Sequence, residues 1–131
     1  MKILIICSVL FFAAGATAMG QKTSTSDPCS DAQTQFEMSQ CAHKEYAKSD
    51  AALNVTYKKL MAALKENGEK YQEKLKDAQL QWIKYRDTTC ESESQLNEGG
   101  TMYPMVYNFC LASVTDERNK RLKAQLTTMT Q

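Results

Sequence analysis

Residues 69–90 read EKYQEKLKDAQLQWIKYRDTTC, a run that contains neither Gly nor Pro. Within this run one set of side chains recurs at intervals of three or four: Leu75, Ala78 or Gln79, Trp82, Tyr85 or Arg86, and Thr89. Such spacing places them on one face of a helix, and the charged residues at 69, 70, 73 and 74 fall on the opposite face. The pattern predicts an amphipathic helix from about Glu69 to Cys90.

A longer helix is expected on the N-terminal side, from Asp31 to about Lys65, where again neither Gly nor Pro occurs. From Leu53 onward the apolar positions follow at intervals of four, three and four, which is one helical face. Ser30 or Asp31 is the expected N-cap. Gly68 stands where a glycine commonly ends a helix.

A third helix is expected to begin near Tyr103-Pro104, because proline suits the first helical turn, and to end after about Leu126. Between the second and third helices, Glu91 to Thr101 is polar and acidic and includes Gly99-Gly100, which predicts a loop. No segment alternates apolar and polar residues for long enough to indicate a strand. The fold class expected is all-α, an up-down-up three-helix bundle with a long first helix.

The N-terminal residues have the features of an export signal. Lys2 precedes an apolar run too short to span a bilayer, and Ala16-Thr17-Ala18 resembles a cleavage site. We therefore expect a signal peptide over 1–18, a flexible tether over 19–28 and one helical domain over 29–131. After removal of the signal no transmembrane segment is expected, and the protein is predicted to be periplasmic or secreted.

Charge is balanced overall but unevenly distributed. The 16 basic residues include Lys2, so 15 remain against 15 acidic ones, which disfavours nucleic acid as a partner. No basic residue lies between Asp87 and Glu117, whereas six lysines and three glutamates lie between Lys58 and Lys76. The sequence thus predicts a molecule with one acidic end near its cysteines and one basic end at the first helical hairpin.

Four cysteines remain once Cys7 leaves with the signal, separated by 12, 49 and 20 positions. No Cys-x-x-Cys or Cys/His spacing typical of a metal site occurs, so two disulfides are expected, with no metal and no cofactor. Geometry alone leaves three pairings open. We favour Cys29–Cys41 with Cys90–Cys110, and Cys41–Cys90 is the main competitor. A Cys29–Cys41 bond requires the chain to fold back, because twelve residues of continuous helix would span about 18 Å.

A buried or half-buried ion pair is predicted between Asp50 and Arg86. If the first two helices are antiparallel and turn near Asn67-Gly68, facing positions have numbers that sum to about 135, as these two do. Each residue also lies on the core-facing stripe of its helix. A pair of this kind fixes helix register more reliably than it adds stability.

Several motifs together resemble the LprI-type lysozyme inhibitor domain family, over about Cys29 to Leu126. They are Cys41-Ala42, DAALN at 50–54 with Tyr57, AQLQWIKYRD at 78–87 followed by Cys90, Gly99-Gly100-Thr101, and Cys110-Leu111 with Thr115 and Arg118. The resemblance implies a helical, disulfide-bonded, exported bacterial domain. Some members of this family inhibit lysozyme and so protect peptidoglycan.

The resemblance and the charge pattern together suggest that the acidic loop binds a cationic lysozyme. The candidate partner-binding residues are Glu91, Glu93, Asn97, Glu98, Gly99, Gly100, Thr101 and Tyr103. An enzymatic role is not expected, because the one histidine, His43, lies among polar residues, the mature cysteines are paired, and no catalytic motif occurs. The alternative is a non-enzymatic cell-envelope binding or scaffold module with a different partner, whose basic hairpin would contact anionic lipid or glycan.

Overall fold

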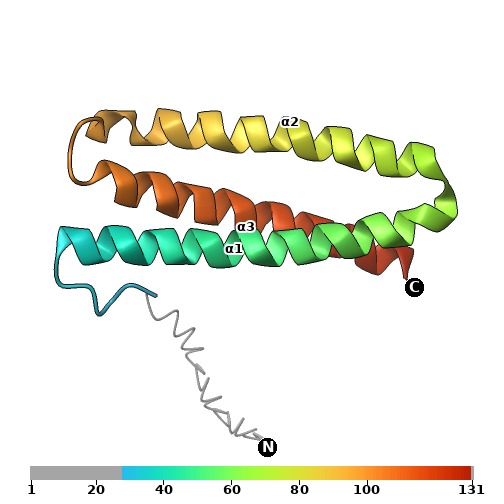
Figure 1. The fold of residues 1–131 in the computed structure, drawn as a ribbon, viewed down its shortest axis with the longest axis horizontal. Coiled ribbons are helices and arrows are strands. Elements are labelled where there is room, and N and C mark those ends of the chain that lie inside the picture. Colours follow the sequence, from blue (N-terminus) through green and yellow to red (C-terminus); the bar gives the residue numbers. More distant parts are fainter. Residues whose placement is uncertain (1–27, 131) are drawn as a thin grey trace, which may run out of the picture.

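The computed structural model describes residues 28–130, which form three long helices and two short 3₁₀ turns (Figure 1). In chain order these are α1 (Gln35–Leu64), η1 (Lys65–Asn67), α2 (Glu69–Ser94), η2 (Gln95–Asn97) and α3 (Tyr103–Met129). Helices α1 and α3 run in the same direction and α2 runs in the opposite one. The expected all-α, three-helix fold is confirmed. The predicted signal peptide and all but the last residue of the predicted tether lie outside the described residues.

Helix α1 begins four residues later than expected. Thr34, rather than Ser30 or Asp31, is the N-cap, and its side chain accepts a hydrogen bond from the backbone N–H of Glu37 at 3.2 Å. The Glu37 carboxylate in return accepts hydrogen bonds from the backbone N–H groups of Gln33 at 2.8 Å and Thr34 at 3.0 Å. These bonds favour the ionised form and lower the pKa of Glu37. Because α1 begins only at Gln35, residues 28–33 lie outside the helix and fold back along it, which brings Cys29 to Cys41.

Helix α2 ends later than expected, because nothing in the sequence stops it at Cys90. It continues to Ser94, whose hydroxyl donates to the backbone carbonyl of Cys90 at 2.7 Å, and η2 then carries the chain to Asn97. The predicted loop over 91–101 is therefore confined to residues 98–102. Helix α3 begins at Tyr103 as expected, with Pro104 in its first turn, and extends to Met129.

Both expected disulfides are present, and both lie at the same end of the molecule. Cys29–Cys41 joins the turn before α1 to the second turn of that helix, with a Cα–Cα distance of 5.8 Å. Cys90–Cys110 joins the end of α2 to the beginning of α3, with a Cα–Cα distance of 5.5 Å. The competing Cys41–Cys90 pairing does not form.

The closest helix packing is between α1 and α3, while α2 makes fewer contacts with either (Figure 1). Three small residues spaced by seven positions are buried along α1, namely Ala42, Ser49 and Thr56. Small or polar residues are also buried on α3, at Ala112, Thr115 and Asn119. Because these side chains are short, two long helices can approach closely over most of their length.

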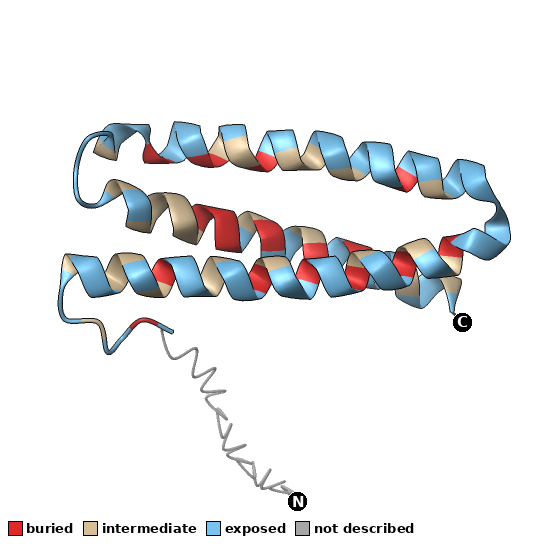
Figure 2. Cartoon of the chain, in the orientation of Figure 1, coloured by how far each residue is buried: buried red, intermediate tan, exposed pale blue. Residues whose placement is uncertain are grey.

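Two clusters of buried apolar residues complete the core, and Figure 2 shows buried residues on all three helices. Toward the hairpin between α1 and α2, the core cluster consists of Leu53, Leu60, Leu64, Leu75 and Leu122. Toward the disulfide end, a second cluster consists of Cys90, Cys110 and Leu111, with Tyr46, Tyr107 and Val114 packed against it. No helix within residues 28–130 is both long and apolar enough to cross a membrane.

Replacing Leu60 by Ala should lower the free energy of unfolding by about 2–5 kcal/mol, because Leu60 is fully buried and the change leaves a cavity. Urea denaturation followed by circular dichroism at 222 nm measures this difference. The matched control is Leu96→Ala, at a position 97 % exposed, where the change should stay within about 0.5 kcal/mol. Similar losses in the two variants would contradict the position of the core described above.

Candidate protein-binding site

A short, tightly closed loop connects η2 to α3. Gly99 has a φ of +73°, a conformation that side chains other than glycine rarely adopt. The backbone N–H of Gly100 donates to the carbonyl of Asn97 at 2.9 Å, and a Cβ atom on Gly100 would lie 3.1 Å from that oxygen. The N–H of Tyr103 then donates to the Gly100 carbonyl at 3.2 Å. These bonds hold the loop in one conformation, with both glycines exposed to solvent.

The eight candidate partner-binding residues all lie at the disulfide end, but they are divided among three helical elements and the loop. Glu91 and Glu93 belong to the last turns of α2 and not to the loop, which corrects the expectation from the sequence. Asn97 is in η2, and Tyr103 is the first residue of α3; both are half-buried. The remaining four, Glu98 to Thr101, form the loop itself and are exposed.

Negative charge is concentrated at this end. Glu91, Glu93 and Glu98 are exposed, and no basic side chain occurs between Asp87 and Glu117. The side chain of Gln95 donates a hydrogen bond to the Glu98 carboxylate, which orients it beside the loop. Exposed carboxylates gathered at one end of the molecule create a negative potential that attracts cationic partners.

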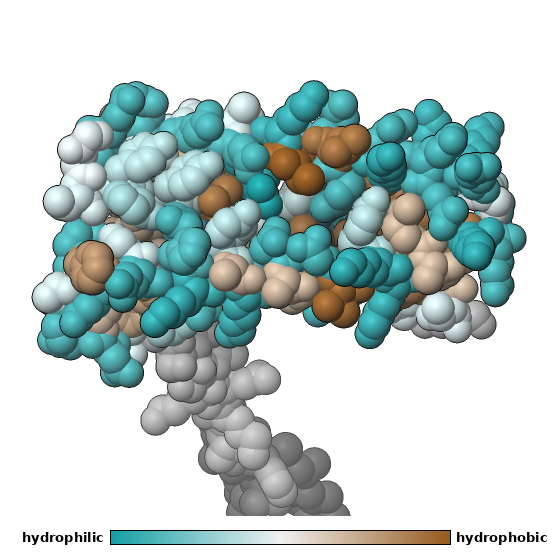
Figure 3. All heavy atoms as spheres, in the orientation of Figure 1, coloured by the Kyte–Doolittle hydropathy of each residue, from teal (hydrophilic) through white to brown (hydrophobic). Residues whose placement is uncertain are grey.

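The opposite end of the molecule is more basic than the hairpin sequence alone indicates. The C-terminal half of α3 lies beside the hairpin between α1 and α2 (Figure 1). Its four cations, Arg118, Lys120, Arg121 and Lys123, therefore join the six hairpin lysines. Figure 3 shows that the visible face is mostly hydrophilic, with apolar groups in small separate patches. Charge is thus the main feature that distinguishes one end from the other.

Apolar side chains are nevertheless exposed beside the acidic residues. Leu96 is 97 % exposed and Met102 is 46 % exposed, and both line a shallow hollow of about 320 Å³ over the loop. A larger hollow of about 570 Å³ lies between the first turns of α1 and α3, where Phe36 is 70 % exposed. Neither Leu96 nor Phe36 was predicted from the sequence as an exposed binding residue. The available signal for Leu96 was its isolation in an otherwise polar segment, ESESQLNEGG.

Tyr103 and Tyr107 support the loop from α3. Their rings stack with centroids 5.8 Å apart and an interplanar angle of 11°. Burial raises the pKa of Tyr107, and the negative charges of Asp87 and Glu91 raise it further. The phenol therefore stays protonated and remains a hydrogen-bond donor below the alkaline range. Because the ring of Tyr103 stacks on that of Tyr107, it is held in a defined orientation at the base of the loop.

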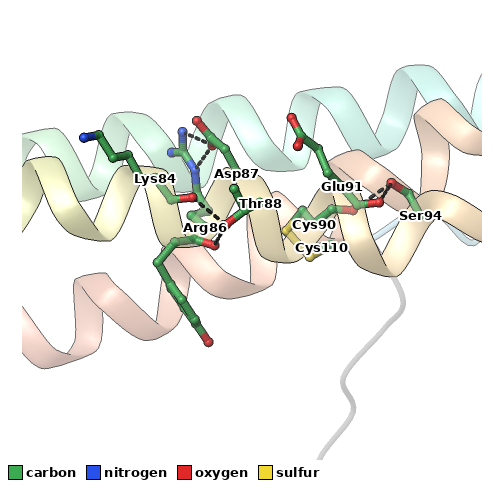
Figure 4. The surroundings of a disulfide bond; sticks show 9 residues. Lys84, Arg86, Asp87, Thr88, Cys90, Glu91, Ser94 and Cys110 are labelled. Carbon is green, nitrogen blue, oxygen red and sulfur yellow. Dashed lines mark hydrogen bonds and ion pairs between the residues drawn. A yellow bond between two sulfur atoms is a disulfide. The ribbon is translucent and has the colours of Figure 1, made fainter.

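Arg86 occupies the core beside the Cys90–Cys110 disulfide (Figure 4). Its Nη1 lies 3.6 Å from Asp50 Oδ1, across the α1–α2 interface as the numbering argument predicted. The closer partner was not foreseen: Nε and Nη2 each lie 2.8 Å from Asp87 Oδ1. The guanidinium also lies 5.4 Å from the ring centroid of Tyr46 and 5.2 Å from that of Trp82. With 8 % exposure, Arg86 is positioned for structural contacts rather than for contact with a partner.

Within residues 28–130 no three His, Cys, Asp or Glu side chains are grouped closely enough to hold a metal ion. All four described cysteines are in disulfides, so none supplies a thiolate. His43 is exposed, and its Nδ1 lies 3.4 Å from Asn108 Oδ1.

Replacing Asp87 by Asn should destabilise the fold by about 1–2 kcal/mol, because Arg86 loses its charged partner at 2.8 Å while remaining buried. Asp50→Asn should cost less, about 0.5 kcal/mol, since Asp87 still pairs with Arg86 and the Asp50 contact is longer, at 3.6 Å. Urea denaturation of the two variants shows which substitution lowers the free energy of unfolding more. An equal or larger loss in Asp50→Asn would show that the contact between α1 and α2 is the stronger one.

Comparison with known proteins gives a consistent assignment. Residues 26–122 match the family described as "Lysozyme inhibitor LprI". An uncharacterized protein of Rhizobium meliloti is 40% identical over 105 residues, which cover 72% of this chain and 76% of that protein. The fold is also similar to the crystal structure of a DUF1311 family protein from Pseudomonas putida, with a TM-score of 0.67 and 21% identity over 72% of this chain and 95% of that chain. The three-helix domain with its two disulfides therefore belongs to the LprI lysozyme inhibitor family.

Proposed function

We propose that this protein binds a cationic lysozyme through its acidic disulfide end and thereby protects peptidoglycan. The observation that carries the proposal is the presence, on one rigid end, of exposed carboxylates beside exposed apolar side chains. Lysozyme is the enzyme proposed as the partner because the family is described as lysozyme inhibitors. Two disulfides suit an oxidising compartment, so the site of action in this proposal is the periplasm or the cell exterior.

The two kinds of side chain have different roles in such a complex. Glu91, Glu93 and Glu98 accelerate and orient the encounter with a positively charged enzyme, because complementary charge acts mainly on the association rate. Leu96 and Met102 are the candidate anchors, since buried apolar contacts account for most of the affinity in protein interfaces. The closed loop reduces the entropy lost on binding, because its backbone is already ordered.

Inhibition would follow from obstruction of the substrate cleft. A muramidase places a carboxylic acid and a carboxylate in an open groove that must admit a polysaccharide. The loop over residues 98–102 connects η2 to α3 at one end of the bundle (Figure 1), and in this proposal it enters or caps such a groove. Its exposed Thr101 hydroxyl can donate a hydrogen bond to a catalytic carboxylate, while the flanking glutamates pair with basic residues at the rim.

The second candidate function is a non-enzymatic module of the cell envelope that binds a different partner. The observation in its favour is the basic end, where Lys120, Arg121 and Lys123 of α3 join the hairpin lysines. A lysis assay distinguishes the two functions: the purified protein is added to a cell-wall suspension with a basic lysozyme. Slower lysis would favour lysozyme inhibition. Unchanged lysis would favour this second function.

Charge reversal by Glu93→Lys with Glu98→Lys should raise the concentration needed for half-inhibition by at least about tenfold, because the association rate depends on complementary charge. The control is Glu66→Lys with Glu69→Lys, which makes the same change in net charge at the opposite end and should leave inhibition unchanged. A lysis assay measures both, with circular dichroism to verify folding. Equal effects in the two double variants would remove the acidic loop from the mechanism.

Leu96→Ser should increase the dissociation rate of the lysozyme complex by about tenfold, with little change in the association rate, because it removes an apolar anchor and no charge. Surface plasmon resonance separates the two rates. Val55→Ser, at a position on α1 that is 55 % exposed and remote from the loop, is the matched control. Unchanged dissociation in Leu96→Ser would show that the anchor lies elsewhere on the acidic end.

A further inference from the structure

A second surface with a different character runs along the side of α2 and α3. Two shallow hollows, of about 290 Å³ and 260 Å³, lie end to end there, and Arg118 lines both. Arg121, Tyr85 and Trp82 line the first hollow, and Tyr71 and Lys74 line the second. The α2 residues of this groove, at positions 71, 74, 78, 82 and 85, recur at intervals of three and four and so share one helical face.

Arg118 is held in place but is not neutralised. Its Nε donates to Gln79 Oε1 at 3.1 Å, and its guanidinium lies 5.7 Å from the ring centroid of Trp82. Within residues 28–130 no carboxylate lies within ion-pair distance of Arg118 or Arg121. Partial burial lowers the pKa of Arg118, and the neighbouring charge of Arg121 lowers it further. An anion placed between the two arginines would relieve this repulsion.

Aromatic rings frame the cations at both ends of the groove. Tyr71 is 58 % exposed and Tyr85 is 60 % exposed, and they are fourteen positions apart, or about 21 Å along the helix. Lys74, Arg118 and Arg121 lie along the groove, and Glu117 is the one carboxylate in its lining. Exposed rings offer stacking faces, and guanidinium groups bind carboxylates with two parallel hydrogen bonds. The groove therefore suits an extended ligand that carries both rings and carboxylates.

The structure of the groove and the charge of the chain disfavour two other classes of ligand, extended peptides and nucleic acids. Both walls are helices with satisfied backbone groups, so an extended peptide finds no strand edge to pair with. A nucleic acid needs a larger excess of positive charge than this chain has, since basic and acidic residues are nearly balanced. Sugar rings with carboxylate substituents need only the side-chain donors and aromatic faces that are present.

We propose that the groove between α2 and α3, formed around Lys74, Arg118, Arg121, Tyr71 and Tyr85, binds a linear glycan that bears carboxylates. This site is separate from the acidic end and does not depend on the binding of lysozyme. A protein with both sites could remain associated with an anionic polysaccharide while its acidic end stays available to a cationic enzyme.

The test uses the purified mature protein and a defined oligomer of galacturonic acid, with a neutral oligomer of galactose of the same length for comparison. Isothermal titration calorimetry should show binding of the acidic oligomer and at least tenfold weaker binding of the neutral one. Lys74→Gln with Arg121→Gln should weaken binding of the acidic oligomer by about tenfold. Lys58→Gln with Lys59→Gln removes the same charge from exposed positions on α1, outside the groove, and should leave binding unchanged.

A third variant tests the aromatic contribution. Tyr85→Ala, at an exposed position, should weaken binding of the acidic oligomer severalfold without lowering thermal stability. Equal weakening by the Lys74/Arg121 and the Lys58/Lys59 double variants would overturn the groove as the site, as would the absence of binding. Equally tight binding of the neutral oligomer, of an acidic peptide or of single-stranded DNA would overturn the carboxylated glycan as the ligand. None of these results depends on whether the protein inhibits lysozyme.

Discussion

Close packing of α1 against α3 determines where every other part of the molecule lies. The contact depends on short side chains, of which Ala42, Ser49 and Thr56 recur once every seven residues on α1. Two neighbouring helices that run in the same direction cannot be joined by a short turn, so α2 must return along their full length. On α3, Thr115 Oγ1 and Asn119 Oδ1 lie buried in this seam without a hydrogen-bond partner among the described residues.

Helix α2 is linked to both other helices near the acidic end. Cys90–Cys110 ties the end of α2 to the beginning of α3, and Arg86 joins α2 to α1 through Asp50. The loop between α2 and α3 is closed at Gly99-Gly100 by backbone hydrogen bonds, which restrict its conformation. Rigidity at this end allows a few exposed side chains to form a defined surface, although the domain is small. A flexible acidic loop would attract a cationic enzyme but would lose more entropy on binding it.

Separation of charge along the bundle gives the two proposed surfaces different partners. The acidic end has carboxylates and apolar anchors for a basic protein, whereas the groove between α2 and α3 has cations and aromatic rings for an anionic polymer. The net charge is close to zero, so neither surface is revealed by composition. Family membership suggests lysozyme as the partner in the first proposal, while the second rests on the two hollows, their tyrosine rings and arginines that no carboxylate among residues 28–130 pairs with.

Helical periodicity and the helix-ending Gly68 were enough to predict three helices and the facing positions of Asp50 and Arg86, because these follow from local geometry and chain connectivity. The export signal and the absence of metal spacing predicted two disulfides, although geometry alone left their pairing open. The sequence could not show that α2 continues through Glu91 and Glu93, because helix ends depend on which capping bonds form. Nor could it bring Arg118 and Arg121 beside the α2 tyrosines, or single out Leu96 as exposed. Those features depend on how far each helix is rotated about its axis, which is decided by packing between elements distant in sequence.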